Sequence, residues 1–485
     1  MPGTSPRIPL RIAVVGGGIS GLAAAYDLAR ARAAGAPIEE YLIEGSDRLG
    51  GALRTERLGD CVFEAGADSF LTAKPEALAL CQELGLGAQV IGSEDSHPRT
   101  WIVRGGELVP LPDGMEFVAP TRLRALARTR LLAWREKLDV LRDLLVRPPS
   151  GAEPSGGRSA EDESVADFVL RHFGRGVLEK LVEPLLAAVY GGVPEELSAR
   201  AVVPRLVELE ERHGSLFRAL RANKKSAAQT EEANSPALFS ALRGGFGELV
   251  TALASRLSQE RIWVGRALAA VEKTETGYRL YCSAEKLLEA DAVVLALPAW
   301  EAARLVRSLD AVLAQTLEAI PYSGSVMVGL VYSKAAVAFL PPGHGFLVPR
   351  REGLRVRACT FVSQKFRHRV PPERELLRCF LGASGDTAVL GWSDEELLTE
   401  ARQELRRLVR VTAEPLAAKV ARWPQALPQY TVGHLGRVET IQKRLAEQRG
   451  FYLAGNACGG VGVSDCIRAG RQAAAACLRV LGAGS

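Results

Sequence analysis

The glycines near the start of the chain have the spacing of a phosphate-binding turn. Gly16, Gly18 and Gly21 form a G-x-G-x-x-G pattern after the β-branched run at residues 11–15, and an Ala/Leu-rich stretch covers 22–34. The first glycine permits a tight turn, the second lets the backbone approach a pyrophosphate, and the third packs the helix against the strand. The pattern predicts a dinucleotide site; a fortuitous glycine turn is the alternative.

A carboxylate and a second pair of glycines extend this pattern. Glu44 ends a predicted strand at residues 38–44, where a carboxylate can accept hydrogen bonds from the ribose of an adenosine. Gly50 and Gly51 follow and let the backbone pass close to a second portion of an extended cofactor. Strand, glycine turn, helix and strand together indicate a βαβ unit, and hence an α/β fold that starts a parallel sheet.

Length and composition place these motifs in a folded protein of two or three domains. The chain has 485 residues, of which 47% are apolar and 24% charged, and this excludes a mostly disordered chain or a fibre. The 61 Lys+Arg and 56 Asp+Glu leave a net charge of +5, so nothing calls for a nucleic-acid partner. With no apolar run near the roughly 20 residues that span a bilayer and no secretion signal, we expect a cytoplasmic protein.

The cysteines and histidines give no sign of a metal site. Eight cysteines occur without a CxxC pair, and the six histidines are scattered. We therefore expect no metal, and reduced, buried thiols. Neither a G-x-S-x-G elbow nor an H-E-x-x-H motif is present, so the sequence predicts no side-chain nucleophile.

Eight further motifs occur between residues 10 and 480 in the order in which one flavoprotein family has them. The chain resembles the HemY-type porphyrinogen oxidases of haem synthesis, within the superfamily of flavin amine oxidases. Residues 358–361 and 376–382 are more similar to the bacterial coproporphyrinogen III oxidase branch than to the mitochondrial protoporphyrinogen IX branch. The motifs lie at residues 48–55, 64–69, 189–198, 213–215, 243–246, 345–349, 428–434 and 455–467.

The resemblance implies an FAD enzyme. FAD would remove six electrons from a porphyrinogen in three rounds, with molecular oxygen as the acceptor and hydrogen peroxide as the product. Coproporphyrinogen III is the expected substrate ahead of protoporphyrinogen IX, and no catalytic side chain is expected because the flavin does the chemistry. An amine oxidase or carotenoid desaturase on the same fold, or a non-catalytic protein that binds FAD and porphyrin, are the alternatives.

The same resemblance implies an interleaved fold: a Rossmann-like, two-dinucleotide-binding FAD domain, a mixed-sheet substrate domain and a helical insertion. The expected segments are 8–92, 237–300 and 423–485 for FAD, 93–120 and 301–422 for substrate, and 121–236 for the helices.

The resemblance also implies the contact residues. Trp423 would flank the flavin ring, or it is a buried structural tryptophan. Arg99 would pair with a propionate, or it is a solvated loop arginine. The implied FAD contacts are Gly16, Gly18, Gly21, Glu44, Gly45, Ala52, Gly66, Ala67, Asp68, Ser69, Leu268, Trp423, Gly455, Gly462, Val463 and Ser464; the implied substrate contacts are Arg99, Leu347, Thr360 and Phe380.

Two basic segments have two interpretations each. Residues 350–369 carry seven Arg/Lys and one acid, Glu352, which suits a cationic rim for substrate carboxylates or a solvated charged hairpin. Residues 121–147 carry eight Arg/Lys and three acids between leucines. They suit a helix packed on the core, or peripheral contact with the inner face of a membrane. We expect a monomer or a homodimer.

Overall fold

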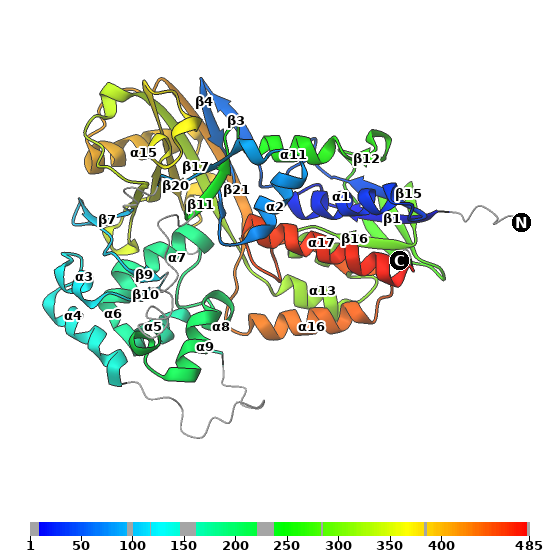
Figure 1. The fold of residues 1–485 in the computed structure, drawn as a ribbon, viewed down its shortest axis with the longest axis horizontal. Helices are drawn as coiled ribbons and strands as arrows, with labels where there is room; N and C mark the ends of the chain where they lie inside the picture. The colour runs from blue at the N-terminus through cyan, green and yellow to red at the C-terminus, as the bar shows by residue number, and fades with distance from the viewer. Residues whose placement is uncertain are drawn as a thin grey trace, which may run out of the picture.

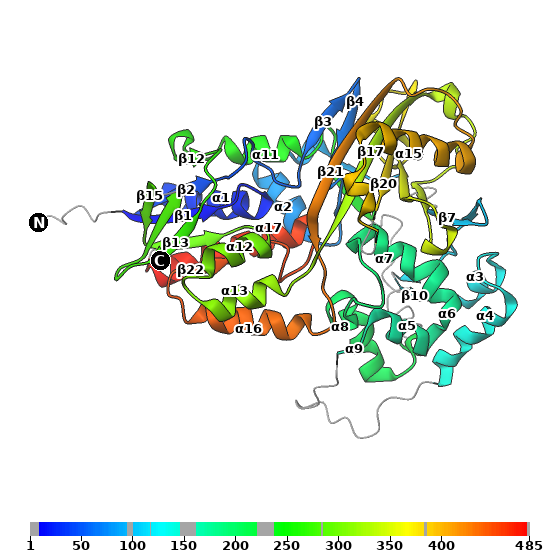
Figure 2. The same cartoon turned by 180° about the vertical axis from the view of Figure 1, so that it is seen from behind.

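The computed structural model describes residues 9–94, 100–116, 118–145, 162–220, 237–282, 285–382 and 386–482. A parallel sheet with its helices lies on one side of the molecule, and a large antiparallel sheet and a helical part lie on the other (Figure 1). Seen from behind, the long strands β17 and β21 extend from the large sheet towards the parallel sheet (Figure 2). The mixed architecture confirms the predicted α/β class.

The parallel sheet has the strand order β12-β2-β1-β16-β22, with all four pairings parallel. The inner strands are apolar because both faces are covered. Ile12 and Val14 pack under α1 (Ile19–Ala33) and α17 (Val463–Val480), whereas Ala13 and Val15 face α12, α13 and the β13–β15 sheet. The strands are β12 (Ile262–Trp263), β2 (Ile38–Ile43), β1 (Leu10–Val15), β16 (Ala292–Leu295) and β22 (Phe451–Leu453).

Helices α1 and α17 pack unusually closely on this face. A Cβ atom at Gly470 of α17 would lie 2.1 Å from the carbonyl oxygen of Ser20 in α1. Most of α1 is buried, and its alanines leave room for a neighbouring helix. The first and last helices of the described chain are thus joined in one layer.

The large sheet has the order β21-β17-β20-β19-β18-β7-β8, with only β18 and β7 parallel. Helix α15 (Asp394–Val409) covers one face through Leu397, Ala401 and Leu405. The other face meets the hairpin of β3 (Thr55–Leu58) and β4 (Cys61–Glu64). The strands are β21 (Ala417–Pro428), β17 (Tyr322–Ser333), β20 (Arg374–Leu381), β19 (Val356–Phe361), β18 (Gly345–Leu347), β7 (Thr100–Arg104) and β8 (Glu107–Pro110).

The helical part has no core of its own, because its apolar cluster also contains Leu347 and Ala358 of the large sheet and Tyr430. The sequence predicted this helical region, although residues 121–145 form two short helices and a 3-10 segment rather than a long helix. Its elements are α3 (Leu123–Arg128), α4 (Trp134–Asp139), η2 (Val140–Leu145), α5 (Val165–Phe173), α6 (Arg175–Val177), η3 (Leu178–Val182), α7 (Glu183–Tyr190), α8 (Ala199–Val202) and α9 (Pro204–His213).

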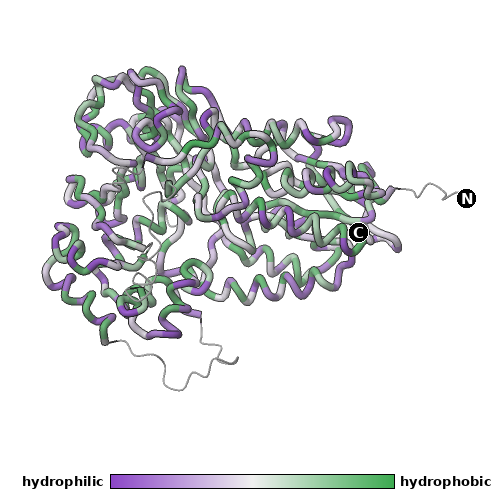
Figure 3. The backbone as a smooth tube through the Cα atoms, in the orientation of Figure 1, coloured by the Kyte–Doolittle hydropathy of each residue, from purple (hydrophilic) through white to green (hydrophobic). Residues whose placement is uncertain are grey.

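Helix α16 (His434–Ala446) shows how sequence pattern positions the surface helices. Hydrophobic and hydrophilic residues alternate along it in Figure 3, and His434, Val438 and Ile441 are buried at helical spacing. The remaining elements are β5 (Phe70–Leu71), α2 (Pro75–Glu83), β6 (Val90–Gly92), β9 (Met115–Glu116), β10 (Ala119–Pro120), β11 (Phe239–Leu242), α11 (Gly247–Ala254), β13 (Ala270–Lys273), β14 (Tyr278–Cys282), β15 (Glu285–Ala290), α12 (Ala299–Val306), α13 (Ala311–Glu318) and α14 (Val362–Lys365).

Candidate functional site

The first glycine turn joins β1 to α1 at the point where the order of the parallel sheet reverses. Gly16 has a φ of +106°, and a Cβ atom there would lie 2.4 Å from the Ala296 carbonyl oxygen. At Gly21 a Cβ would lie 1.8 Å from the Gly16 oxygen, whereas at Gly18 it would meet no atom within 4 Å. Packing therefore requires glycine at positions 16 and 21, whereas Gly18 faces open space.

The N-terminus of α1 is suited to a negatively charged group. Its cap residue, Gly18, makes no side-chain capping bond, and the first turn holds no acidic residue. The first N–H groups of a helix and its dipole attract anions. At the end of β2, the Glu44 carboxylate accepts hydrogen bonds from the backbone N–H groups of Gly17 (2.6 Å) and Ser46 (2.7 Å). These bonds hold the carboxylate beside the N-terminus of α1. Each carboxylate oxygen keeps acceptor capacity for a further donor.

The second glycine pair lies directly against the first turn. The N–H of Gly50 donates to Gly17 O (2.8 Å), and a Cβ at Gly51 would lie 3.1 Å from the Gly18 Cα. Ala52 in turn packs against the segment at residues 66–69, since a Cβ at Gly66 would lie 1.8 Å from Ala52 O. Residues 50–52 and 66–69 are thus brought beside the glycine turn.

Residues 264–268 flank the carboxylate end of β2. The N–H of Arg266 donates to Glu44 O (2.9 Å), and a Cβ at Gly45 would lie 3.3 Å from Ala267. Leu268 is half-buried against the apolar cluster beneath this end of the sheet. The segment that carries Leu268 therefore lies beside Gly45.

The last glycine-rich segment leads from β22 into α17. Gly455 has a φ of +127°, and Gly462 caps α17. Val463 and Ser464 are buried, and the Ser464 hydroxyl donates to Lys74 O (3.1 Å). Their side chains serve packing, so only their backbone is free to face a ligand.

Trp423, on β21, lies against the loop that follows β4. Its indole N–H donates to Ala65 O (2.5 Å), and its ring edge lies 3.4 Å from the Cβ position of Gly66. The side chain is half-buried. The structure thus brings Trp423 to the 64–69 segment, as both interpretations of this residue allow.

Three predicted substrate contacts share one face of the large sheet. Leu347 pairs with Ala358, and Ala358 pairs with Phe380, so this row crosses β18, β19 and β20. Thr360 stands two residues further along β19 and therefore faces the same side. Phe380 packs against both the helical part and the β3–β4 hairpin. Arg99 lies outside the described residues.

The cations of residues 350–369 are all paired with carboxylates, at 2.6 to 3.5 Å. An unpaired cationic rim is therefore not what this segment forms. The solvated hairpin is also wrong for Arg357 and Arg369, which are buried. The pairs are Arg350–Glu195, Arg351–Glu179, Arg355–Asp386, Arg357–Glu183, Lys365–Asp68, Arg367–Glu94 and Arg369–Glu64.

Sequence reasoning missed a buried charge cluster around the 64–69 segment. Lys365 lies 3.1 Å from Asp68, and Arg369 lies 3.3 Å from Glu64. Arg378 lies 3.6 Å from Asp68. Burial alone would raise the pKa of Asp68, but Lys365 and Arg378 outweigh burial and hold this pKa well below its usual range. The excess of basic residues in 350–369 was the only signal in the sequence.

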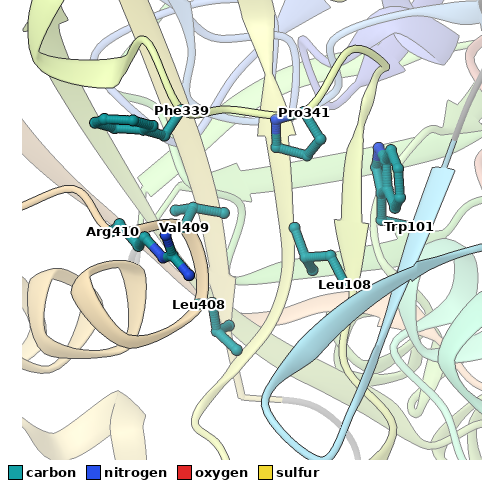
Figure 4. Close-up of a pocket in the computed structure, with 7 residues that line it drawn as sticks. All are labelled: Trp101, Leu108, Phe339, Pro341, Leu408, Val409 and Arg410. Atoms are coloured by element: carbon teal, nitrogen blue, oxygen red, sulfur yellow. The ribbon is translucent and has the colours of Figure 1, made fainter.

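A separate surface pocket of about 260 Å³ lies between β7, β8 and the end of α15 (Figure 4). Its lining contains none of the predicted contacts, and we do not include it in the site. The lining residues are Trp101, Leu108, Phe339, Pro341, Leu408, Val409 and Arg410. Within the described ranges, no helix is long and apolar enough to cross a membrane, and no three His, Cys, Asp or Glu side chains are grouped to hold a metal ion.

A glycine turn at the reversal point of a parallel sheet, beside a second glycine-rich strand–helix unit, is the arrangement of a dinucleotide-binding protein. The chain belongs to the flavin-containing amine oxidoreductase family, whose model matches residues 19–478. FAD is its cofactor, and both the family and the cofactor predicted from the sequence are confirmed.

Similar proteins cover nearly the whole chain. It is 28% identical to the coproporphyrinogen III oxidase of Bacillus subtilis (97% of this chain, 98% of the relative). It is 33% identical to that of Propionibacterium freudenreichii (96% and 90%). The crystal structure of a candidate protoporphyrinogen oxidase from Exiguobacterium sp. 255-15 superposes with a TM-score of 0.84 at 30% identity, covering 99% and 100% of the two chains.

Proposed function

We propose that the protein oxidises a porphyrinogen to the porphyrin in haem biosynthesis, with molecular oxygen as acceptor. The observation that carries this proposal is the apolar row of Leu347, Ala358 and Phe380, which faces the helical part beside the 64–69 segment. The apolar pyrrole rings of such a macrocycle suit this wall. The names of the similar proteins support the same substrate class.

The residues present fit FAD. Gly18 leaves open space where a pyrophosphate can approach the uncapped helix α1, and Glu44 is held where it can accept from a ribose. We assign the cofactor contacts to Gly16, Gly18, Gly21, Glu44, Gly45, Ala52, Gly66, Ala67, Asp68, Ser69, Leu268, Trp423, Gly455, Gly462, Val463 and Ser464. For Val463 and Ser464 the assignment concerns the backbone alone.

When bound, FAD supplies the two-electron oxidation of the macrocycle, one round for each hydride and proton removed. Three rounds turn one porphyrinogen into one porphyrin and reduce three O₂ to three H₂O₂. The chain itself orients the substrate and excludes water. Water is excluded by the apolar cluster that the helical part forms together with Leu347, Ala358 and Tyr430.

Coproporphyrinogen III stands ahead of protoporphyrinogen IX as the substrate, because the curated relatives given above carry its name. The basic segment 350–369 does not separate the two, since its cations are already paired. We assign substrate contact to Leu347, Thr360 and Phe380, and a propionate to Arg99.

The proposal needs only one chain, so it holds for a monomer or a homodimer. We assign residues 8–92, 237–300 and 423–485 to the FAD domain, 93–120 and 301–422 to the substrate domain, and 121–236 to the helical domain. The separate parallel sheet, large sheet and helical part in Figures 1 and 2 support this division, although β21 crosses the boundary at residue 422.

The deciding experiment mixes the purified yellow protein anaerobically with coproporphyrinogen III or protoporphyrinogen IX and follows the loss of flavin absorbance. Faster loss with coproporphyrinogen supports the stated order, and faster loss with protoporphyrinogen reverses it. In air, the ratio of peroxide released to porphyrin formed should be three. No loss of flavin absorbance with either substrate would contradict the proposed activity.

Peripheral membrane contact is proposed for the basic segment 121–147. Among the described residues of this segment, five large apolar side chains are exposed, with Trp134 at 67%. Arginines surround them, and Arg135 lies over the Trp134 ring at 5.3 Å. A basic surface with an exposed tryptophan suits the interface of an anionic bilayer. The exposed apolar residues are Leu123, Trp134, Leu138, Leu141 and Leu144.

A further inference from the structure

Arg378 occupies the middle of the predicted substrate wall. It lies on β20, directly opposite Thr360 of β19 and Gly329 of β17. Phe380 stands two residues further along the strand and therefore faces the same side. The side chain is only 3% exposed. An arginine is thus buried between two predicted substrate contacts.

The guanidinium of Arg378 binds the segment that follows β4. Its Nε donates to Glu64 O at 2.8 Å, and Nη2 donates to Gly66 O. Nη1 lies 3.6 Å from the Asp68 carboxylate. The Arg378 side chain therefore contacts two backbone carbonyls and one carboxylate of residues 64–68. Three residues of this segment, Gly66, Ala67 and Asp68, are assigned FAD contacts.

The same guanidinium packs on the substrate wall. Its central carbon lies 4.6 Å from the centre of the Phe380 ring. A guanidinium on an aromatic face is attractive and fixes the plane of the ring. Arg378 therefore touches both the wall and the flavin-side segment.

Further charges surround this contact. Lys365 lies 3.1 Å from Asp68, and its ammonium lies 4.7 Å from the centre of the Phe239 ring. Arg369 binds Glu64, and also Asp68 O at 2.8 Å. The buried Arg369 and Arg378 and the half-buried Lys365 thus face Glu64 and Asp68, and Glu248 also acts on Arg369. Loss of Arg378 would therefore remove one positive charge from a group whose charges balance.

We propose that Arg378 is a positioning residue that couples the substrate wall to the FAD-binding segment 64–69 and favours reduced flavin through its charge. The proposal rests on the FAD contacts assigned above. Arg378 sets the height of Gly66 and Asp68 relative to Phe380, so cofactor and substrate keep a fixed spacing. Its charge opposes the cost of placing electrons on the cofactor.

The test compares Arg378→Met, Arg378→Lys and the matched control Arg374→Met. Arg374 lies four residues earlier on β20, pairs with Ser333 of β17, and has no hydrogen bond or ion pair with residues 64–69 in the described structure. FAD affinity of the apoprotein, hydrogen exchange of residues 64–69 and the flavin midpoint potential are measured without any porphyrinogen. These results stand even if porphyrinogen oxidation fails, so the two failures are distinguishable.

We expect Arg378→Met to weaken FAD binding by about tenfold or more, since charge-assisted hydrogen bonds are lost. It should also speed exchange in 64–69 and shift the midpoint potential to more negative values. Arg378→Lys should restore most of the potential but not the FAD affinity, because an ammonium lacks the fork that reaches both carbonyls. In porphyrinogen oxidation by Arg378→Met, kcat should fall by a larger factor than KM rises.

Wild-type FAD affinity, exchange and potential in Arg378→Met would overturn the proposal. So would equal effects of Arg374→Met, which would show a general weakening of β20. If Arg378→Met does not fold, Arg378→Lys decides alone: a potential or an FAD affinity that departs from the pattern above contradicts the coupling role.

Discussion

At the level of single residues, the glycines of the first turn have two separate roles. Gly21 is enclosed by the Gly16 carbonyl, whereas Gly18 has extended, ordinary backbone angles and no atom within 4 Å of a Cβ. Packing therefore requires a glycine at position 21, whereas only a ligand would require one at position 18. This difference allows the cofactor assignment to be tested without changing the fold.

We expect Gly18→Ala to fold with an unchanged Tm but to bind FAD at least about tenfold more weakly, because its methyl group occupies the approach to α1. Gly21→Ala should lose about 3 kcal/mol of stability or more, since its Cβ overlaps a backbone oxygen. Thermal unfolding of the apoproteins and FAD titration measure the two effects. Full FAD affinity in Gly18→Ala would place the pyrophosphate elsewhere.

At the level of elements, Asp143 ties three segments of the helical part together. Its carboxylate, on η2, accepts from His172 of α5 (2.5 Å), from the Ser215 hydroxyl (2.7 Å) and from two backbone N–H groups that follow Ser215. His172 also lies 3.2 Å from Glu210 of α9. Burial alone would lower the pKa of His172, but the bonds to Asp143 and Glu210 outweigh burial and raise it.

A raised pKa in the folded state means that protonated His172 stabilises the fold below the unfolded pKa of about 6.5. This stability is lost as the pH rises through the folded pKa. We therefore expect the stability gap between wild type and His172→Gln, about 3 kcal/mol near pH 6, to shrink in mildly alkaline buffer. Denaturant midpoints across this range measure it. The control His213→Gln, an exposed residue on α9, should show no such gap.

A second histidine responds to pH in the opposite direction. His434 begins α16 and stacks on Tyr430 (centroids 4.1 Å apart), and neither ring nitrogen has a hydrogen-bond partner among the described residues. Burial, with Arg437 nearby, lowers the pKa of His434 to about 4. The unfolded chain binds this proton first, so stability falls as the pH drops from about 6.5 to about 4.

The variant His434→Phe keeps the stacked ring and removes the titrating group. We expect it to be more resistant than wild type to unfolding in this acidic range and similar to wild type near pH 7. Tm measured as a function of pH tests the prediction. Equal acid sensitivity in wild type and His434→Phe would show that folding does not lower the pKa of His434, and would contradict the prediction.

At the level of the whole molecule, the exposed apolar side chains of α3, α4 and η2 lie on the part farthest from the parallel sheet (Figure 1). We expect Trp134→Ser combined with Leu138→Ser to reduce binding to anionic lipid vesicles by about tenfold, because interfacial binding scales with buried apolar area. Flotation with anionic and neutral vesicles measures this. Phe339→Ser, at a residue 75% exposed in the turn between β17 and β18, is the control and should bind like wild type. Absence of vesicle binding by the wild type would refute the contact.

The sequence predicted what depends on local order. The turn from Gly16 to Gly21, the carboxylate of Glu44, the two flanking strands and helix α1 follow from residues close in the chain. The structure has the ends of these elements within three residues of the prediction. The relation of Thr360 to Arg378 depends on the pairing of β19 with β20, and the bonds of Arg378 to Glu64 and Gly66 join segments more than 300 residues apart. No local pattern specifies such a register, so the charge cluster was missed. The 121–145 segment was predicted as helical but is broken, since tertiary packing decides helix ends.

The contact between Gly470 and Ser20 has a consequence for how the protein is made. Strand β1 and helix α1 are synthesised well before the elements that cover their apolar faces, since β16 and α17 follow some 270 to 450 residues later. During that interval the first βαβ unit must stay shielded by chaperones or remain unfolded. A chain interrupted before residue 462 would leave the Ser20 backbone uncovered and would lack Gly462, Val463 and Ser464, three of the assigned FAD contacts. We therefore expect FAD to bind only after this last segment has been synthesised.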